Sequence, residues 1–151
     1  MSSTVCIQFD NDMLSSLAPN MPISRAFNLM NGIMQRPVMD MCSAMTRSDV
    51  GLLKHAVGNA THAKFGLGLS RDDDRSRKIV EEAVSSPWFD YPLEEVKAAV
   101  AIYSSSDPWQ READDICSQL VSKLPSATIA WGTYADQALK DRIRLSLVIC
   151  R

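Results

Sequence analysis

Hydrophobic residues change their spacing several times along residues 62–150, and this pattern constrains the fold more than any other feature of the sequence. Alternating apolar and polar residues, or a short wholly apolar run, are typical of β-strands. Apolar residues that recur every three or four positions are typical of helices that bury one side. Strands are therefore predicted over residues 62–69, 98–103, 128–133 and 142–150, and helices over residues 73–84 and 110–123. This order predicts an α/β (or α+β) chain folded as a two-layer sandwich, with helices packed on one four-stranded sheet.

Two of these strands also indicate which residues face the core. In the last strand, the inward positions are expected to be Ile143, Leu145, Leu147 and Ile149. In the strand over residues 62–69, Gly66 and Gly68 share the face opposite Phe65, and they leave a bare patch where a helix can approach closely. Ile116, Leu120 and Leu145 are predicted to be core residues.

The two helices have recognisable starts. Asp107, Pro108 and Gln110 fit an N-cap, a first helical position and a third helical position, so the second helix is expected to be capped by Asp107. The carboxylates at 72–74 suit the positive end of the first helix, and the basic residues around them predict a solvated helix end held by ion pairs.

The first 45 residues follow a different plan. A short strand is predicted over residues 5–9, and a long helix over residues 24–45 with one continuous apolar stripe. Pro37 lies inside this helix and is expected to kink it. The chain is thus divided into a strand and long spine helix at 1–45 and a sandwich domain at 46–151, with a further short helix predicted over residues 48–57.

Composition narrows the class of protein. Hydrophobic residues make up 46% and charged residues 23% of the chain, and the net charge is −2. A nucleic acid or an anionic membrane is therefore not an expected partner. The sequence contains no apolar run long enough to span a bilayer, and its start lacks the pattern of a signal peptide, so a cytoplasmic location is expected. The four cysteines are far apart, with no zinc-binding spacing.

Residues with recognisable chemistry are few. His55 and His62 have no carboxylate or cysteine at a spacing that completes a metal site. Gly66-Leu67-Gly68 begins like a dinucleotide fingerprint, but Arg71 occupies the place of the third glycine. The sequence therefore predicts no catalytic residue, no metal and no cofactor.

Several stretches nevertheless form a recognisable succession. Gly66-Leu67-Gly68 is followed by Asp74-Arg75 and by a helix that ends in Ser85-Ser86-Pro87. Further stretches lie at residues 5–14, 98–102, 127–133 and 139–150. In this order they resemble the C-terminal domain of FtsZ, the bacterial homologue of tubulin, and Ala26-Phe27 with Asn31 is similar to the start of that family's central helix. The resemblance covers nearly the whole chain.

The resemblance implies the C-terminal domain and central helix of the FtsZ/tubulin family without its nucleotide-binding domain. The family's glycine-rich phosphate loop has no counterpart in these 151 residues. Phe27 and Asn31 match positions that contact the guanine base in the family, but they are not expected to hold GTP without a cradle for its phosphates. Arg47, Asp49 and Leu52 fall on the family's N-x-D-x-x-D catalytic loop, of which only the first acid is kept. No GTPase activity is expected, since leucine cannot polarise a water.

The function expected from this resemblance is that of a non-catalytic interaction module, which binds itself or a protein partner and caps or modulates an FtsZ-type filament. A small-ligand-binding or enzymatic domain that reuses the sandwich, and a decayed fragment of a GTPase, stay open as alternatives. Without a nucleotide domain, the helical stripe loses part of its cover, and a partner or a second copy in a two-fold dimer is expected to bury it. The predicted interface residues are Phe27, Met30, Met34, Val38 and Met41.

Overall fold

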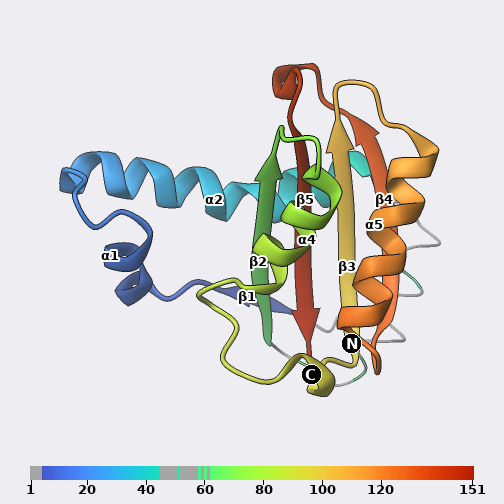
Figure 1. Ribbon diagram of the computed structural model, residues 1–151. Coiled ribbons are helices and arrows are strands. Elements are labelled where there is room, and N and C mark those ends of the chain that lie inside the picture. The colour runs from blue at the N-terminus through green and yellow to red at the C-terminus, as the bar shows by residue number, and fades with distance from the viewer. Residues whose placement is uncertain (1–4, 45–50, 52–57, 59, 61) are drawn as a thin grey trace.

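The computed structural model describes residues 5–44, 51, 58, 60 and 62–151. The described residues form a five-stranded sheet with the order β1-β2-β5-β3-β4 (Figure 1). Its strands are β1 (Cys6–Gln8), β2 (His62–Ser70), β3 (Ala98–Ser105), β4 (Thr128–Ala135) and β5 (Ile143–Cys150). The predicted fold class is confirmed, and the four strands predicted over residues 62–150 all lie in one sheet. The strand near the N-terminus pairs in parallel with β2 and extends the sheet.

Strand β5 lies at the centre of the sheet. It pairs antiparallel with β2 on one side and with β3 on the other, while β3 and β4 pair in parallel. All eight of its residues are buried, so the prediction of one inward and one outward face is incomplete. Both faces of the sheet are covered at this strand, and the residues between the predicted inward positions are therefore buried as well.

Helices cover the two faces of the sheet unequally. The long helices are α2 (Ile23–Ala44), α4 (Arg75–Val84) and α5 (Gln110–Lys123). The short ones are η1 (Asn11–Met13), α1 (Leu14–Leu17), η2 (Leu93–Glu95) and η3 (Gln137–Leu139). Figure 1 shows α4 and α5 side by side on the front face, with α2 crossing behind the sheet. The expected helix at 48–57 falls almost wholly outside the described residues.

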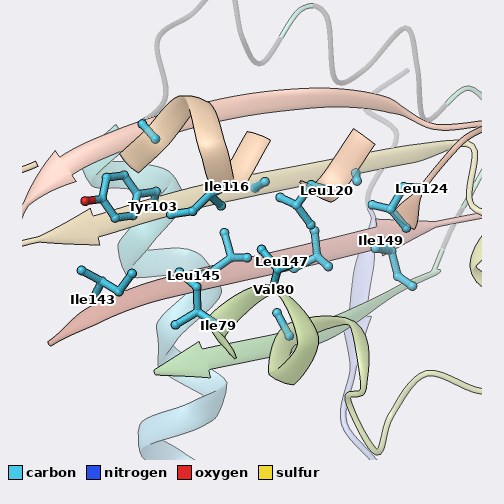
Figure 2. Close-up of a cluster of buried hydrophobic side chains, with 14 of the residues drawn as sticks. Ile79, Val80, Tyr103, Ile116, Leu120, Leu124, Ile143, Leu145, Leu147 and Ile149 are labelled. Carbon is cyan, nitrogen blue, oxygen red and sulfur yellow. The ribbon is translucent and has the colours of Figure 1, made fainter. Parts of the chain in front are cut away.

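The main core lies between the sheet and the pair α4 and α5 (Figure 2). Ile116, Leu120 and Leu145 have no exposed surface, which confirms them as core residues. A second cluster lies on the opposite face, where Phe65, Val100 and Ile102 are buried. The sheet is therefore packed on both sides.

Gly66 and Gly68 allow α4 to lie directly on β2, as their shared face predicted. A Cβ added to Gly66 would lie 2.1 Å from the backbone oxygen of Ala83, and one added to Gly68 would lie 2.1 Å from the oxygen of Ile79. Any larger residue at either position would collide with helix backbone.

The helix starts are only partly as predicted. Helix α5 begins at Gln110 with Trp109 at its N-cap, so the predicted cap at Asp107 is wrong. Strand β3 continues to Ser105. The Asp107 N–H lies before the helix and donates to the Ser105 hydroxyl at 3.1 Å. At the start of α4, Arg77 pairs with Asp74 at 2.5 Å and Lys78 pairs with Asp72, as expected for a salt-bridged helix end.

Candidate functional site

Helix α2 is the element that sets this fold apart from a plain sandwich. Its C-terminal half crosses the second face of the sheet, and its N-terminal half projects past the edge at β2 (Figure 1). Ala26, Met30, Pro37 and Asp40 are buried. Ile33, Met41 and Ala44 are partly buried against the second-face cluster. The helix continues through Pro37 from Ile23 to Ala44.

The side of α2 next to the buried one exposes large apolar residues. Ile23 is 76% exposed, Phe27 50%, Met34 45% and Val38 57%. Their spacing of four, seven and four residues places them along one side of a helix. We call these four residues the α2 outer face. A row of this kind is unusual on the surface of a monomer and is typical of a protein-binding site.

The structure separates the five residues of the predicted interface. Phe27, Met34 and Val38 lie on the α2 outer face, whereas Met30 is only 2% exposed and Met41 packs toward the sheet. The stripe read from the sequence therefore spans two adjacent sides of one helix, and only one of them is open. Since Met30 is covered within the chain itself, it is not available to a partner.

The two predicted base-contact positions, Phe27 and Asn31, are neighbours on α2. Asn31 is exposed one turn after Phe27 on α2. The catalytic-loop positions Arg47, Asp49 and Leu52 lie outside the described residues, so their expected roles stay predictions.

A buried polar cluster holds α2 against the sheet, and sequence reasoning did not find it. Asp40 has no exposed surface. Its carboxylate accepts hydrogen bonds from the hydroxyls of Ser146 and Tyr134 and from the Arg144 guanidinium at 3.2 Å. Arg36, one turn earlier on α2, lies 3.1 Å from the same carboxylate. We call Asp40, Arg144, Tyr134 and Ser146, with Arg36, the Asp40 cluster.

The Arg144 guanidinium connects this cluster to the edge of the sheet. Its Nη2 atom also donates to the Tyr134 hydroxyl at 2.7 Å and to the Asp136 carboxylate at 3.0 Å. Burial opposes ionisation of Asp136, but hydrogen bonds from Arg144 and from the Ala138 N–H outweigh it and lower its pKa. Burial, followed by the hydrogen bond to Asp40, raises the pKa of Tyr134.

These contacts argue for a structural role of the Asp40 cluster. Both oxygens of the Asp40 carboxylate accept donors from the protein, and the residue has no exposed surface through which a substrate could reach it. A buried ion pair contributes little net stability, but it strongly disfavours arrangements that leave one charge unpaired. The cluster therefore fixes the position of α2 on the sheet. The sequence did offer a signal for this cluster. Asp40 lies on the buried side of α2, and Arg144 and Ser146 are the polar residues that alternate with the apolar ones along β5.

The described part of the chain offers no catalytic constellation. No group of three or more metal-binding side chains is found among the described residues. No helix within the described ranges is long and apolar enough to cross a membrane. The open side of α2, held in place by the Asp40 cluster, is therefore the candidate functional site.

Comparison with known proteins decides the family. Residues 61–151 match the model of the C-terminal domain of the FtsZ family. The chain belongs to the FtsZ family. It is 30% identical over 149 residues to cell division protein FtsZ 1 of Thermococcus kodakarensis, which covers 95% of this chain and 40% of that protein. It is 29% identical to cell division protein FtsZ of Methanothermobacter thermautotrophicus over 95% of this chain and 39% of the relative.

Solved structures of FtsZ agree with this assignment. The empty FtsZ dimer of M. jannaschii superposes with a TM-score of 0.82 at 27% identity, over 95% of this chain and 44% of that one. CetZ2 from Haloferax volcanii shares the fold, with a TM-score of 0.67 at 14% identity over 96% of this chain and 45% of that one. The chain thus spans about 40% of the length of the curated FtsZ relatives that it matches, and the predicted resemblance to the FtsZ C-terminal domain is confirmed.

Proposed function

We propose that these residues form a non-catalytic interaction module of the FtsZ type, which docks on a protein through the α2 outer face. The observation that carries the proposal is the exposure of Phe27, Met34 and Val38 on a helix whose other side is buried. The partner is a second copy of the chain or an FtsZ-type protein. In the latter case the module caps or modulates a filament in the cytoplasm.

The rigidity of α2 supports this proposal. A docking surface binds more tightly when its side chains need not be ordered on binding. The Asp40 cluster and the packing of Met30 hold the helix, so the α2 outer face is presented in one orientation. Apolar side chains at the centre of an interface supply most of its binding energy, and Phe27 and Met34 are of this kind.

Two features support a role without GTP hydrolysis. The 151 residues contain no glycine-rich phosphate loop to cradle a nucleotide. The carboxylate of Asp40 has no exposed surface and accepts hydrogen bonds from neighbouring side chains.

The proposal is tested by placing a charge on the α2 outer face. Met34→Glu introduces a carboxylate at the centre of the face, and Gln35→Glu introduces the same charge at an exposed neighbour that lies off it. Sedimentation velocity measures self-association, and light scattering of M. jannaschii FtsZ assembling with GTP measures an effect on filaments. Circular dichroism checks that both variants fold.

Loss of self-association or of the effect on assembly in Met34→Glu, with both retained in Gln35→Glu, supports the proposal. If the unmodified chain is a monomer at high concentration and leaves FtsZ assembly unchanged, the α2 outer face is not an interface of either kind. The proposal is also wrong if both variants behave like the unmodified chain.

A further inference from the structure

A cavity of about 400 Å³ lies at the lower end of the sheet in Figure 1, beside the start of β2 and the C-terminal end of β5. Its side chains come from β1, β2, the segment after α4 and the last residue of the chain. The polar and aromatic ones are Gln8, His62, Lys64, Asp90, Tyr91 and Arg151, and Ala60 completes the lining. None of them belongs to the α2 outer face or to the Asp40 cluster.

The cavity follows from the way α4 covers β2. His62 and Lys64 share a face of β2 with Gly66 and Gly68, and Gln8 of β1 pairs in register with Lys64. Helix α4 lies on the two glycines and ends at Val84. Beyond that point a connecting segment brings Asp90 and Tyr91 to the rim, so polar side chains of the sheet line a hollow there.

Two basic side chains, Lys64 and Arg151, and one carboxylate, Asp90, line this cavity. The side chain of Lys64 is 19% exposed, and its ammonium lies 3.5 Å from the carboxylate of Asp90, which is itself 66% exposed. This ion pair is long for a charge-assisted hydrogen bond, and its carboxylate is mostly exposed, so the ammonium can take a second, closer oxygen acceptor from the cavity. The guanidinium of Arg151 lies 4.7 Å from the centre of the Tyr91 ring. The same guanidinium also pairs with the carboxylate of Glu95 at 3.2 Å, and Glu95 does not line the cavity.

We propose that this cavity binds a small organic anion that carries a carboxylate or a phosphate group. The anionic oxygens bind Lys64 and Arg151, because an ammonium and a guanidinium are the donors that such oxyanions take in proteins. The ring of Tyr91 and the amide of Gln8 contact the rest of the molecule. The volume lies within the range of about 300–1,000 Å³ that is usual for small-molecule sites.

Asp90 gives the proposal an unusual test, because it competes with the ligand for Lys64. Removing the Asp90 charge by Asp90→Asn should strengthen anion binding by about threefold, whereas Lys64→Met should weaken it by about tenfold or more. If Lys64 and Asp90 form only a structural ion pair, Asp90→Asn and Lys64→Met should change anion affinity in the same direction. Lys123→Met, at the exposed end of α5, removes an equal charge away from the cavity and serves as the matched control.

The experiment is a ¹H–¹⁵N NMR titration of the full chain with sodium phosphate and, separately, sodium succinate, at constant ionic strength. Sorbitol is the neutral probe. Saturable shifts at Lys64 and Tyr91 with either anion and none with sorbitol support the proposal, and the anion that saturates identifies the preferred oxyanion. Absence of saturation with both anions overturns it. So does an effect of Lys123→Met equal to that of Lys64→Met, or a loss of affinity in Asp90→Asn.

Discussion

Replacing Gly68 with alanine is expected to be among the most disruptive small changes possible in this chain. The added Cβ would lie 2.1 Å from the backbone oxygen of Ile79, 2.7 Å from its carbonyl carbon and 2.8 Å from its Cα. Ordinary van der Waals contact begins at 3.4 Å. All three atoms belong to helix backbone, so no side chain can rotate away, and α4 itself must move off β2.

The displacement would disturb the main core. Helix α4 contributes Ile79, Val80 and Ala83 to it, and each has no exposed surface. Overpacking of a well-filled core costs about 1–3 kcal/mol. Because a whole helix must shift here, we expect the free energy of unfolding to fall by about 2–4 kcal/mol, a large share of the roughly 5–15 kcal/mol of a typical domain.

Gly32→Ala is the matched control, since it adds the same methyl group at a glycine with free space. Gly32 lies in the interior of α2, and a Cβ there would meet no atom within 4 Å. Alanine is a better helix former than glycine, so this variant is expected to gain about 0.5–1 kcal/mol. The two substitutions should therefore change stability in opposite directions.

Urea unfolding, followed by circular dichroism and by the fluorescence of the three tryptophans, of which Trp88 is buried, measures both effects. With a slope of about 2 kcal/mol per molar urea, in the middle of the usual range, Gly68→Ala should lower the midpoint by roughly 1–2 M. A midpoint unchanged from the unmodified protein would refute the close approach of α4 to β2. Equal losses in the two variants would show that the effect does not arise from this contact.

Four further outcomes are expected. Leu120→Ala removes a fully buried side chain and should cost about 2–5 kcal/mol in urea unfolding, whereas a loss under about 0.5 kcal/mol would show that Leu120 is not core. Asp40→Asn removes the buried carboxylate that Arg144 and Arg36 share and leaves Arg144 with Asp136 alone, so it should cost about 3 kcal/mol, and no loss would contradict a structural Asp40 cluster. Burial and then the hydrogen bond to Glu112 raise the pKa of Tyr103 to about 12, so its contribution to stability is complete below pH 10 and is lost as the pH rises toward 12. Tyr103→Phe should therefore flatten the decline of unfolding free energy over that range, and an identical decline would refute this assignment. Calorimetry with GTP should detect no saturable binding, and a micromolar dissociation constant would overturn the expectation drawn from the missing phosphate loop.

The local pattern of the sequence was sufficient for most elements of the sandwich. Period-two alternation located β2 and β5, and the shared face of Gly66 and Gly68 predicted the close approach of α4. These features depend on the geometry of a single strand, in which every second side chain points the same way. The predicted cap at Asp107 was wrong because β3 extends to Ser105, the Asp107 N–H donates to the Ser105 hydroxyl, and the helix begins only at Gln110.

Tertiary structure decided what covers each face. An alternating strand shows which residues share a side, but not whether a segment far along the chain covers the polar side as well. In this protein α2 does so, and Asp40 reaches Arg144 and Ser146 across more than a hundred residues of sequence. The same packing buries Met30 and leaves Phe27, Met34 and Val38 exposed, although one helical period describes them all. The sequence alone therefore determined the class of fold and the apolar stripe of α2, while long-range packing determined which part of that stripe is free to bind a partner.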